Sequence, residues 1–155
     1  MMITSIFREW RPMIDKILIE KKLRKIEEFL RELEAAPVRS FEDFQANVVT
    51  RRFIERNIEL AIEQMVDICK HLVGGLDLKE PETYAECFDI LAAGGVIHTD
   101  AAVKFKAMVR FRNMLIHVYD GIDDSITYGI YTRHIGDFTF FVDQLRRFLK
   151  EKPGS

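Results

Sequence analysis

The stretch IERNIELAIEQMVDICKHLVGG, residues 54–75, decides the fold of this chain. Its apolar residues recur at spacings of three and four, the period of an amphipathic helix. One apolar row contains Ile54, Ile58, Ala61, Met65, Ile68 and Leu72, and a second row beside it contains Ile62, Val66, Cys69 and Val73. The two rows make the helix apolar over a wide arc, which predicts a central helix that contacts several neighbours. Gly74 and Gly75 are expected to end it.

Helical patterns also lie on both sides of this stretch. Upstream, the apolar residues of the segment 19–33 follow the same spacing, and this helix is expected to stop near Ala36, before Pro37. Downstream, Pro81 is suited to the first position of a helix. The helix that it opens should end at the glycine pair 94–95.

Two further helices are expected in the C-terminal part of the chain. Thr99 or Asp100 can cap a helix that runs through Met114. The following segment, 120–129, contains glycines and several acids and is expected to form a loop. A last apolar pattern over residues 138–148 predicts the final helix.

The fold class that follows is all-α: a single-domain bundle of about five helices. We expect an N-terminal arm at residues 1–13, a helical domain at residues 14–150 and a frayed tail at residues 151–155. No segment alternates with a period of two for long enough to predict a sheet.

Composition restricts the class of protein further. The chain has 155 residues, 48% of them apolar and 31% charged, so it can bury a core without disulfides or metals. A net charge of -2 gives no overall positive field for nucleic acids. Cys69 and Cys87 lack metal or redox spacing and are expected to be buried free thiols in a reducing compartment. No run is apolar enough for a signal peptide or a membrane span, which favours a cytoplasmic protein.

The candidate functional site is the segment RFRNMLIHVY, residues 110–119. Within it Arg112, His117 and Tyr119 stand at positions i, i+5 and i+7. Arginine binds phosphate with a permanent forked charge, and histidine moves protons near neutral pH. Tyrosine adds a hydroxyl group. The three groups together indicate chemistry on a phosphodiester that needs no metal and no cofactor.

The pattern Arg112-Asn113-x-x-x-His117-x-Tyr119 resembles the Arg-x4-His-x-Tyr signature of HEPN-domain proteins. Among these it is most similar to the HepT-type toxins of bacterial and archaeal toxin–antitoxin pairs. The resemblance extends over residues 14–149, with the motif helix near the C-terminal end of the bundle, although only the motif itself is specific.

This resemblance implies several properties of the chain. HEPN proteins of this type are metal-independent ribonucleases, and they are typically homodimers with the motif at the interface. HepT-type toxins are commonly encoded beside a minimal nucleotidyltransferase antitoxin, MntA-like, which adds AMP to the motif tyrosine. The corresponding residue here is Tyr119. An adenylate next to Arg112 would block RNA by its bulk and by its charge.

The chemistry can also be argued from the residues themselves. Internal cleavage of RNA requires a proton to leave the 2′-OH, and His117 can accept it. Arg112 can stabilise the negative charge that develops on the phosphate. Asn113 lies four residues before His117 on the same helix face and could orient it. A 2′,3′-cyclic phosphate is the expected product.

A regular helix places Arg112 and His117 about 140° apart around its axis. Three solutions are open. The helix loosens before His117, or the long arginine side chain reaches around, or two copies of the chain form a composite site. We favour the dimer, which supplies both an acid and a base.

RNA binding is expected from the same helix. Lys104, Lys106 and Arg110 accompany Arg112 between residues 101 and 117, where no acid occurs. Phe105 and Phe111 lie between these cations, and a basic strip with aromatic neighbours suits single-stranded RNA. Alternatively the cations form a solvated face and the phenylalanines belong to the core.

Each motif residue has an alternative structural role. His117 could be a core histidine, Tyr119 an amphipathic anchor, and Arg112 the ion-pair partner of Asp120 or Asp123. On those readings the chain is a catalytically silent HEPN binding or scaffold subunit for a nucleotidyltransferase, or a helical interaction protein without nucleotide chemistry. No cluster has metal-ligand spacing.

Overall fold

The computed structural model describes residues 14–117, 121 and 123–151. Seven α-helices occur in these residues: α2 (Lys16–Glu34), α3 (Phe41–Ala46), α4 (Val48–Gly75), α5 (Tyr84–Ala93), α6 (Thr99–His117), α7 (Asp124–Arg133) and α8 (Ile135–Glu151). The described residues contain no strand, and the all-α prediction is confirmed. The predicted number of about five helices is too low. The N-terminal arm and residues 152–155 of the tail lie outside the described residues.

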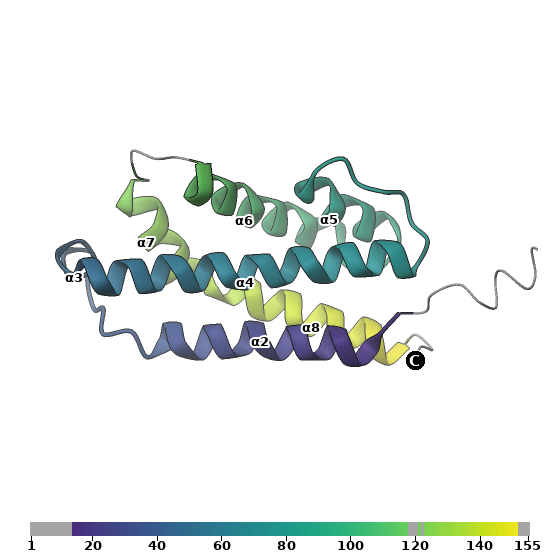
Figure 1. Cartoon of the computed structure of the whole chain (residues 1–155), viewed down its shortest axis with the longest axis horizontal. Helices are drawn as coiled ribbons and strands as arrows, with labels where there is room; N and C mark the ends of the chain where they lie inside the picture. The colour runs from purple at the N-terminus through teal and green to yellow at the C-terminus, as the bar shows by residue number, and fades with distance from the viewer. Residues whose placement is uncertain (1–13, 118–120, 122, 152–155) are drawn as a thin grey trace, which may run out of the picture.

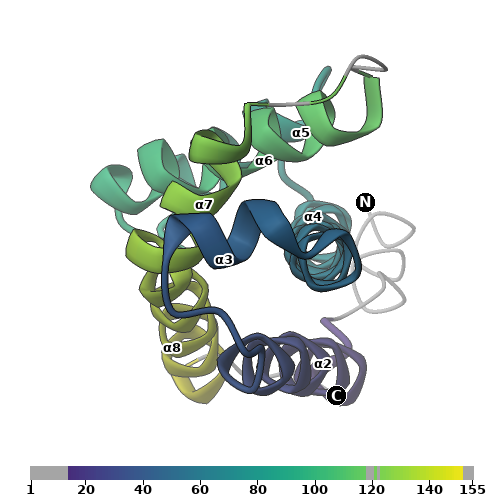
Figure 2. The same ribbon diagram turned by 90° about the vertical axis from the view of Figure 1, so that its left-hand side faces the viewer.

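Helix α4 runs through the middle of the bundle (Figure 1), as its wide apolar arc predicts. It contacts α2 on one side and α5 and α6 on the other, and it also touches α3 and α7. Helix α8 packs against α2, α6 and α7. The end view in Figure 2 shows α3 lying across one end of the bundle, with α2 and α8 together on one side and α5 and α6 on the other.

The two unpredicted helices, α3 and α7, begin at short polar caps. The hydroxyl of Ser40 accepts a hydrogen bond from the backbone N–H of Asp43 at 3.1 Å and starts α3. The carboxylate of Asp123 accepts from the backbone N–H of Ser125 at 2.9 Å and starts α7. Part of the segment expected to be a loop is therefore helical, and Gly129 lies inside α7.

Two predicted helix starts are also wrong. Pro81 precedes α5, whose N-cap is Thr83, because the Thr83 hydroxyl accepts from the backbone N–H of Glu86 at 3.1 Å. Thr99 and Asp100 both lie inside α6, so neither is its cap. The C-terminal ends of two helices are predicted better than these starts. Helix α4 ends at Gly75, and α5 ends just before the glycine pair 94–95. The φ of Gly95 is 78°, a conformation that favours a residue without Cβ.

The prediction of two free thiols is wrong, because Cys69 of α4 and Cys87 of α5 form a disulfide. Both residues are fully buried, and their Cα atoms are 6.2 Å apart. Each cysteine belongs to the apolar face of its helix, and α4 and α5 pack together through those faces. The argument for a reducing compartment that rested on free thiols therefore no longer applies.

Phenylalanine rings join α5, α6 and α8 in the core. Phe105 of α6 lies 5.2 Å from Phe141 and 5.8 Å from Phe88, measured between ring centroids, with the rings edge to face. Phe88 and Phe141 are themselves 6.2 Å apart, and all three side chains are fully buried. Edge-to-face aromatic packing of this kind fixes the position of α6 relative to both neighbours.

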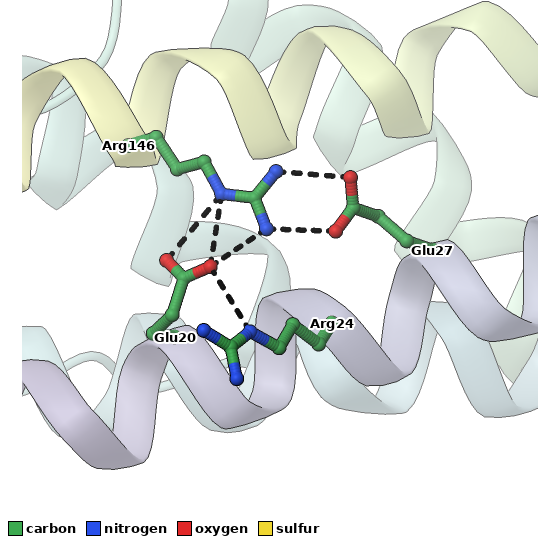
Figure 3. A network of polar contacts seen from close by, with 4 residues as sticks. All are labelled: Glu20, Arg24, Glu27 and Arg146. Atoms are coloured by element: carbon green, nitrogen blue, oxygen red, sulfur yellow. Dashed lines mark hydrogen bonds and ion pairs between the residues drawn. The ribbon is translucent and has the colours of Figure 1, made fainter.

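Helices α2 and α8 are joined by the guanidinium of Arg146, which contacts two glutamates (Figure 3). Its Nη2 donates to Glu20 Oε1 and to Glu27 Oε1, both at 2.7 Å, and its Nη1 donates to Glu27 Oε2 at 2.9 Å. The hydrogen bonds from Arg146 lower the pKa of Glu27. The two carboxylates in turn raise the pKa of Arg146.

We expect Arg146→Gln to lower the free energy of unfolding by about 1–2 kcal/mol at pH 7, because charge-assisted hydrogen bonds are lost from a partly exposed network. The folded-state pKa of Glu27 lies below its ordinary 4.5. The stabilisation is therefore present above pH 4.5 and is lost as the pH falls through the lower folded value. Urea unfolding at pH 7 and at pH 3 measures this, and the difference between native and variant should shrink at pH 3.

The matched control is Arg147→Gln, which removes the same charge from the next, exposed residue of α8. It should change stability by less than about 0.5 kcal/mol. Equal effects of the two variants would show that net charge, and not the contact between α2 and α8, sets the stability.

No helix in the described part of the chain is both long enough and apolar enough to cross a membrane.

Candidate active site on helix α6

A cavity of about 790 Å³ lies beside the C-terminal half of α6. Its walls come from the end of α4, the connection from α4 to α5, the start of α5, and α6. Helix α6 contributes Asn113 and His117, α4 contributes Lys70, and Tyr84 is the first residue of α5. Two of the predicted site residues therefore share one cavity wall.

Helix α6 is continuous through His117, its last described residue. The helix does not loosen between Arg112 and His117, which removes the first of the three geometric solutions. Asn113 and His117 are both exposed and both line the cavity, one helical turn apart. His117 is therefore not a core histidine.

Arg112 points away from this face, toward α4 and α5. Its Nη2 lies 3.5 Å from Glu63 Oε1, and its Cζ lies 5.6 Å from the centroid of the Tyr84 ring. The side chain is 19% exposed, and its Nε is buried without a hydrogen-bond partner among the described residues. Arg112 does not itself line the cavity, but the Tyr84 ring beside it does.

The acid that pairs with Arg112 is not one of the two expected from the sequence. Among the described residues its ion-pair partner is Glu63, 49 positions earlier in the chain. Asp123 instead accepts two hydrogen bonds from Ser125, one from the hydroxyl and one from the backbone N–H. These two bonds lower the pKa of Asp123. Asp120 lies outside the described residues, as does Tyr119.

Three residues near the site were missed by sequence reasoning: Glu63, Lys70 and Tyr84. Lys70 Nζ lies 5.3 Å from the Tyr84 ring centroid, so two cations approach one aromatic ring. Glu63 and Lys70 belong to a long amphipathic helix, and nothing in their local sequence distinguishes them from other polar positions. The one available signal was an aromatic residue at the start of a helix, Tyr84.

The cations expected to bind RNA do not lie on a single face of α6. Lys104 Nζ lies over the Phe140 ring of α8 at 5.4 Å, whereas Lys106 forms an ion pair with Asp89 of α5 at 3.1 Å. Arg110 is exposed. Helical spacing puts Lys106 and Arg110, but not Lys104, on the side that carries Asn113 and His117.

The aromatic residues between these cations, Phe105 and Phe111, are 0% and 3% exposed. They cannot stack on RNA, and the alternative that assigns them to the core is confirmed. Among the described residues, Tyr84 offers an accessible aromatic ring at this end of α6 and is 44% exposed.

An exposed stripe follows the outer face of α6. It consists of Val103, Ala107, Arg110, Met114 and His117, spaced by four, three, four and three residues. Val103 is 63% exposed and Met114 is 37% exposed, although both are apolar. This spacing is the one by which helices pack against each other in coiled coils.

Within the described ranges, no three or more side chains of His, Cys, Asp and Glu are grouped so as to hold a metal ion. His71 and His134 each have a hydrogen-bond partner. His71 Nε2 accepts from the backbone N–H of Asp15, and His134 Nδ1 contacts the carboxylate of Asp137.

An all-α bundle with an arginine and a histidine on one helix beside a cavity is the arrangement expected of a HEPN ribonuclease. Comparison with known families agrees: the sequence model of the family described as Ribonuclease HepT-like matches residues 19–151. The chain belongs to the HepT-like family.

Two individual proteins that are similar to this chain in sequence are both described as HepT nucleases. The tRNA nuclease HepT of Aphanizomenon flos-aquae is 24% identical over 136 residues, covering 88% of this chain and 92% of that protein. The mRNA nuclease HepT of Shewanella oneidensis is 27% identical over 90 residues, covering 58% of this chain and 68% of the relative.

The fold is also similar to that of a solved toxin structure. The tri-AMPylated HEPN toxin of Shewanella oneidensis, in complex with its MNT antitoxin, superposes with a TM-score of 0.77 at 22% identity. The similarity covers 83% of this chain and 96% of the toxin chain.

Proposed function

We propose that this protein is the toxin of a toxin–antitoxin pair, a metal-independent endoribonuclease that cleaves RNA in the cytoplasm through Arg112 and His117. The observation that carries the proposal is the exposed pair Asn113 and His117 on the wall of a 790 Å³ cavity, with the Arg112 guanidinium against the Tyr84 ring of the same wall. A cavity of this size accommodates a nucleotide. The nuclease activity of two HepT relatives supports the assignment.

The reaction needs one proton acceptor and one proton donor. His117 takes the proton of the 2′-OH as the 2′-oxygen forms a bond to phosphorus. The bond from phosphorus to the 5′-oxygen breaks, and that oxygen leaves with a proton. Arg112 neutralises the charge on the phosphate during the exchange. The products are a 2′,3′-cyclic phosphate and a 5′-hydroxyl, and no step calls for a metal.

A homodimer through the exposed stripe of α6 supplies two copies of His117 to one cleft, so that one accepts the proton and the other donates it. The stripe has the apolar residues and the spacing that such an interface requires. A dimer also doubles the positive charge of Lys106 and Arg110 near the RNA.

We expect Val103→Asp to raise the dissociation constant of the dimer at least about tenfold. The substitution buries a carboxylate in an apolar contact, about three helical turns away from the cavity. Sedimentation or light scattering at micromolar concentration measures the change, and cleavage should fall in parallel. Ile17→Asp, on the exposed face of α2, is the matched control and should remain dimeric. A dimeric Val103→Asp protein would rule out this interface.

Regulation is proposed to come from a minimal nucleotidyltransferase antitoxin, MntA-like, that adds AMP to Tyr119. Support comes from the tri-AMPylated HEPN toxin of Shewanella oneidensis, which shares the fold and is bound to an MNT antitoxin. Tyr119 stands two positions after His117 in the sequence, so an adenylate there would carry its negative charge next to the cleavage site.

The deciding experiment is cleavage of total RNA in EDTA by protein whose mass shows an unmodified Tyr119. The native protein should cut, and Arg112→Ala and His117→Ala should cut at least about a hundredfold more slowly. Asn113→Ala should be intermediate, since it acts by orienting His117. An unmodified native protein that leaves RNA intact would instead support the silent scaffold subunit.

A further inference from the structure

We propose that Tyr84 is a positioning residue of this site: its ring holds the Arg112 guanidinium at the cavity that His117 lines. The inference deepens the proposed ribonuclease function and rests on it. It answers a problem that α6 creates, since an unbroken helix separates Arg112 and His117 by about 140° and about 7.5 Å along the axis. Within one chain, a second side chain must bring the arginine toward the histidine.

Tyr84 contacts Arg112 and lines the same cavity as His117. Its ring centroid lies 5.6 Å from Arg112 Cζ, within the range of a cation–π contact. The same side chain lines the cavity together with Asn113 and His117. Because Tyr84 is 44% exposed, part of the ring faces open space rather than the core.

The backbone around Tyr84 is fixed by hydrogen bonds at the start of α5. The Thr83 hydroxyl accepts from the backbone N–H of Glu86 at 3.1 Å, and the Glu86 carboxylate accepts from the backbone N–H of Glu82, also at 3.1 Å. The first bond is the N-cap of α5, and the second ties the residue before the cap to the first turn, one position earlier than in a capping box. Lys79 adds an ion pair to Glu86 at 3.4 Å. The ring is therefore carried by an ordered turn.

An aromatic ring is better suited than a second acid to hold the Arg112 guanidinium in place. Glu63 already contacts Arg112, but only through Nη2 and at 3.5 Å, and this is the only side-chain hydrogen bond of Arg112 among the described residues. A second carboxylate would hold the guanidinium more firmly while cancelling the charge needed by a phosphate. The face of Tyr84 orients the guanidinium and leaves its positive charge in place.

The test is a double-mutant cycle measured by steady-state RNA cleavage. Tyr84→Phe keeps the ring and should stay within about twofold of the native rate. Tyr84→Leu and Tyr84→Met remove the ring and should lower kcat about tenfold with little change in KM, the size of one cation–π contact. In an Arg112→Gln background, Tyr84→Leu should cause no further loss, because the two side chains act together.

Phe53→Leu is the matched control, since Phe53 is a similarly exposed aromatic residue, 40% exposed, on α4 outside the cavity. It should leave cleavage unchanged. Thermal unfolding of all variants should stay near the native value, because none of the replaced rings is fully buried. A loss of rate that follows a loss of stability, with no rescue by Tyr84→Phe, would overturn the proposal.

A second readout does not depend on activity. The Arg112 guanidinium carbon lies 5.6 Å from the Tyr84 ring centroid and its Nε is buried, so we expect the Nε–H signal to show a ring-current shift and slow exchange in NMR. Tyr84→Phe should preserve this signal and Tyr84→Leu should remove the shift. If Arg112→Gln abolishes cleavage while Tyr84→Leu changes neither kcat nor the signal, the positioning role is wrong and the ribonuclease stands. If Arg112→Gln and His117→Ala both cleave normally, the proposed function fails, and the NMR signal alone decides the role of Tyr84.

Discussion

Replacing His117 with alanine is expected to lower kcat for RNA cleavage by about 10²–10⁴-fold, the contribution of a positioned general acid or base. The imidazole sits on the last turn of α6, exposed and on the cavity wall, where a 2′-OH can reach it. Alanine is a good helix former, so the change removes the proton acceptor and leaves the helix intact.

The rate is measured with an excess of enzyme over a short single-stranded RNA, and the product end is identified by mass as a cyclic phosphate. His134→Ala is the control, since its side chain is 54% exposed at the junction of α7 and α8 and does not line the cavity. Stability should change by less than about 0.5 kcal/mol in both variants. A His117→Ala protein that keeps more than a tenth of the native rate would exclude His117 as the proton carrier.

Replacing Phe105 with alanine is expected to lower the free energy of unfolding by about 3–5 kcal/mol, the usual cost of deleting a buried aromatic side chain. The side chain is fully buried and packs edge to face on Phe88 and Phe141. Its removal leaves a cavity where α5, α6 and α8 meet. Neighbouring rings can fill it only partly, because each is held by its own contacts.

Urea unfolding followed by circular dichroism measures this loss, and the melting temperature should fall by roughly 10 °C. Val49→Ala is the control, and because Val49 is 79% exposed at the start of α4, outside the proposed interface, its loss should cost less than about 0.5 kcal/mol. A cost below about 1 kcal/mol for Phe105→Ala would mean that α6 is not anchored by this ring cluster.

The sequence predicts the long helices well because their apolar period is repeated many times. The wide apolar arc of α4 correctly predicts its central position, and the pattern at residues 19–33 correctly predicts α2. The short helices were missed for the opposite reason. Helix α3 has six residues, too few for a period, and the acids before α7 look like loop residues although Asp123 is its N-cap.

The site was predictable only in part, because its contacts come from distant segments. Helical spacing correctly places Asn113 and His117 together and Arg112 elsewhere. Nothing in a single sequence shows that Glu63 would meet Arg112, or that Cys69 would meet Cys87, since both pairs join different helices. Tyr84 belongs to the site only because α5 folds back beside α6.

The distribution of burial along α6 has a consequence for heat and denaturant. Its buried residues end at Phe111, and Met114, Ile116 and His117 are exposed, so the turn that carries His117 makes few packing contacts. Segments with few buried contacts open at a lower free energy than the whole fold, whereas Arg112 is held between α4 and α5. On heating, we expect the His117 side chain to lose its fixed orientation while the bundle remains native. Amide exchange along α6 will report this local limit where a melting curve does not.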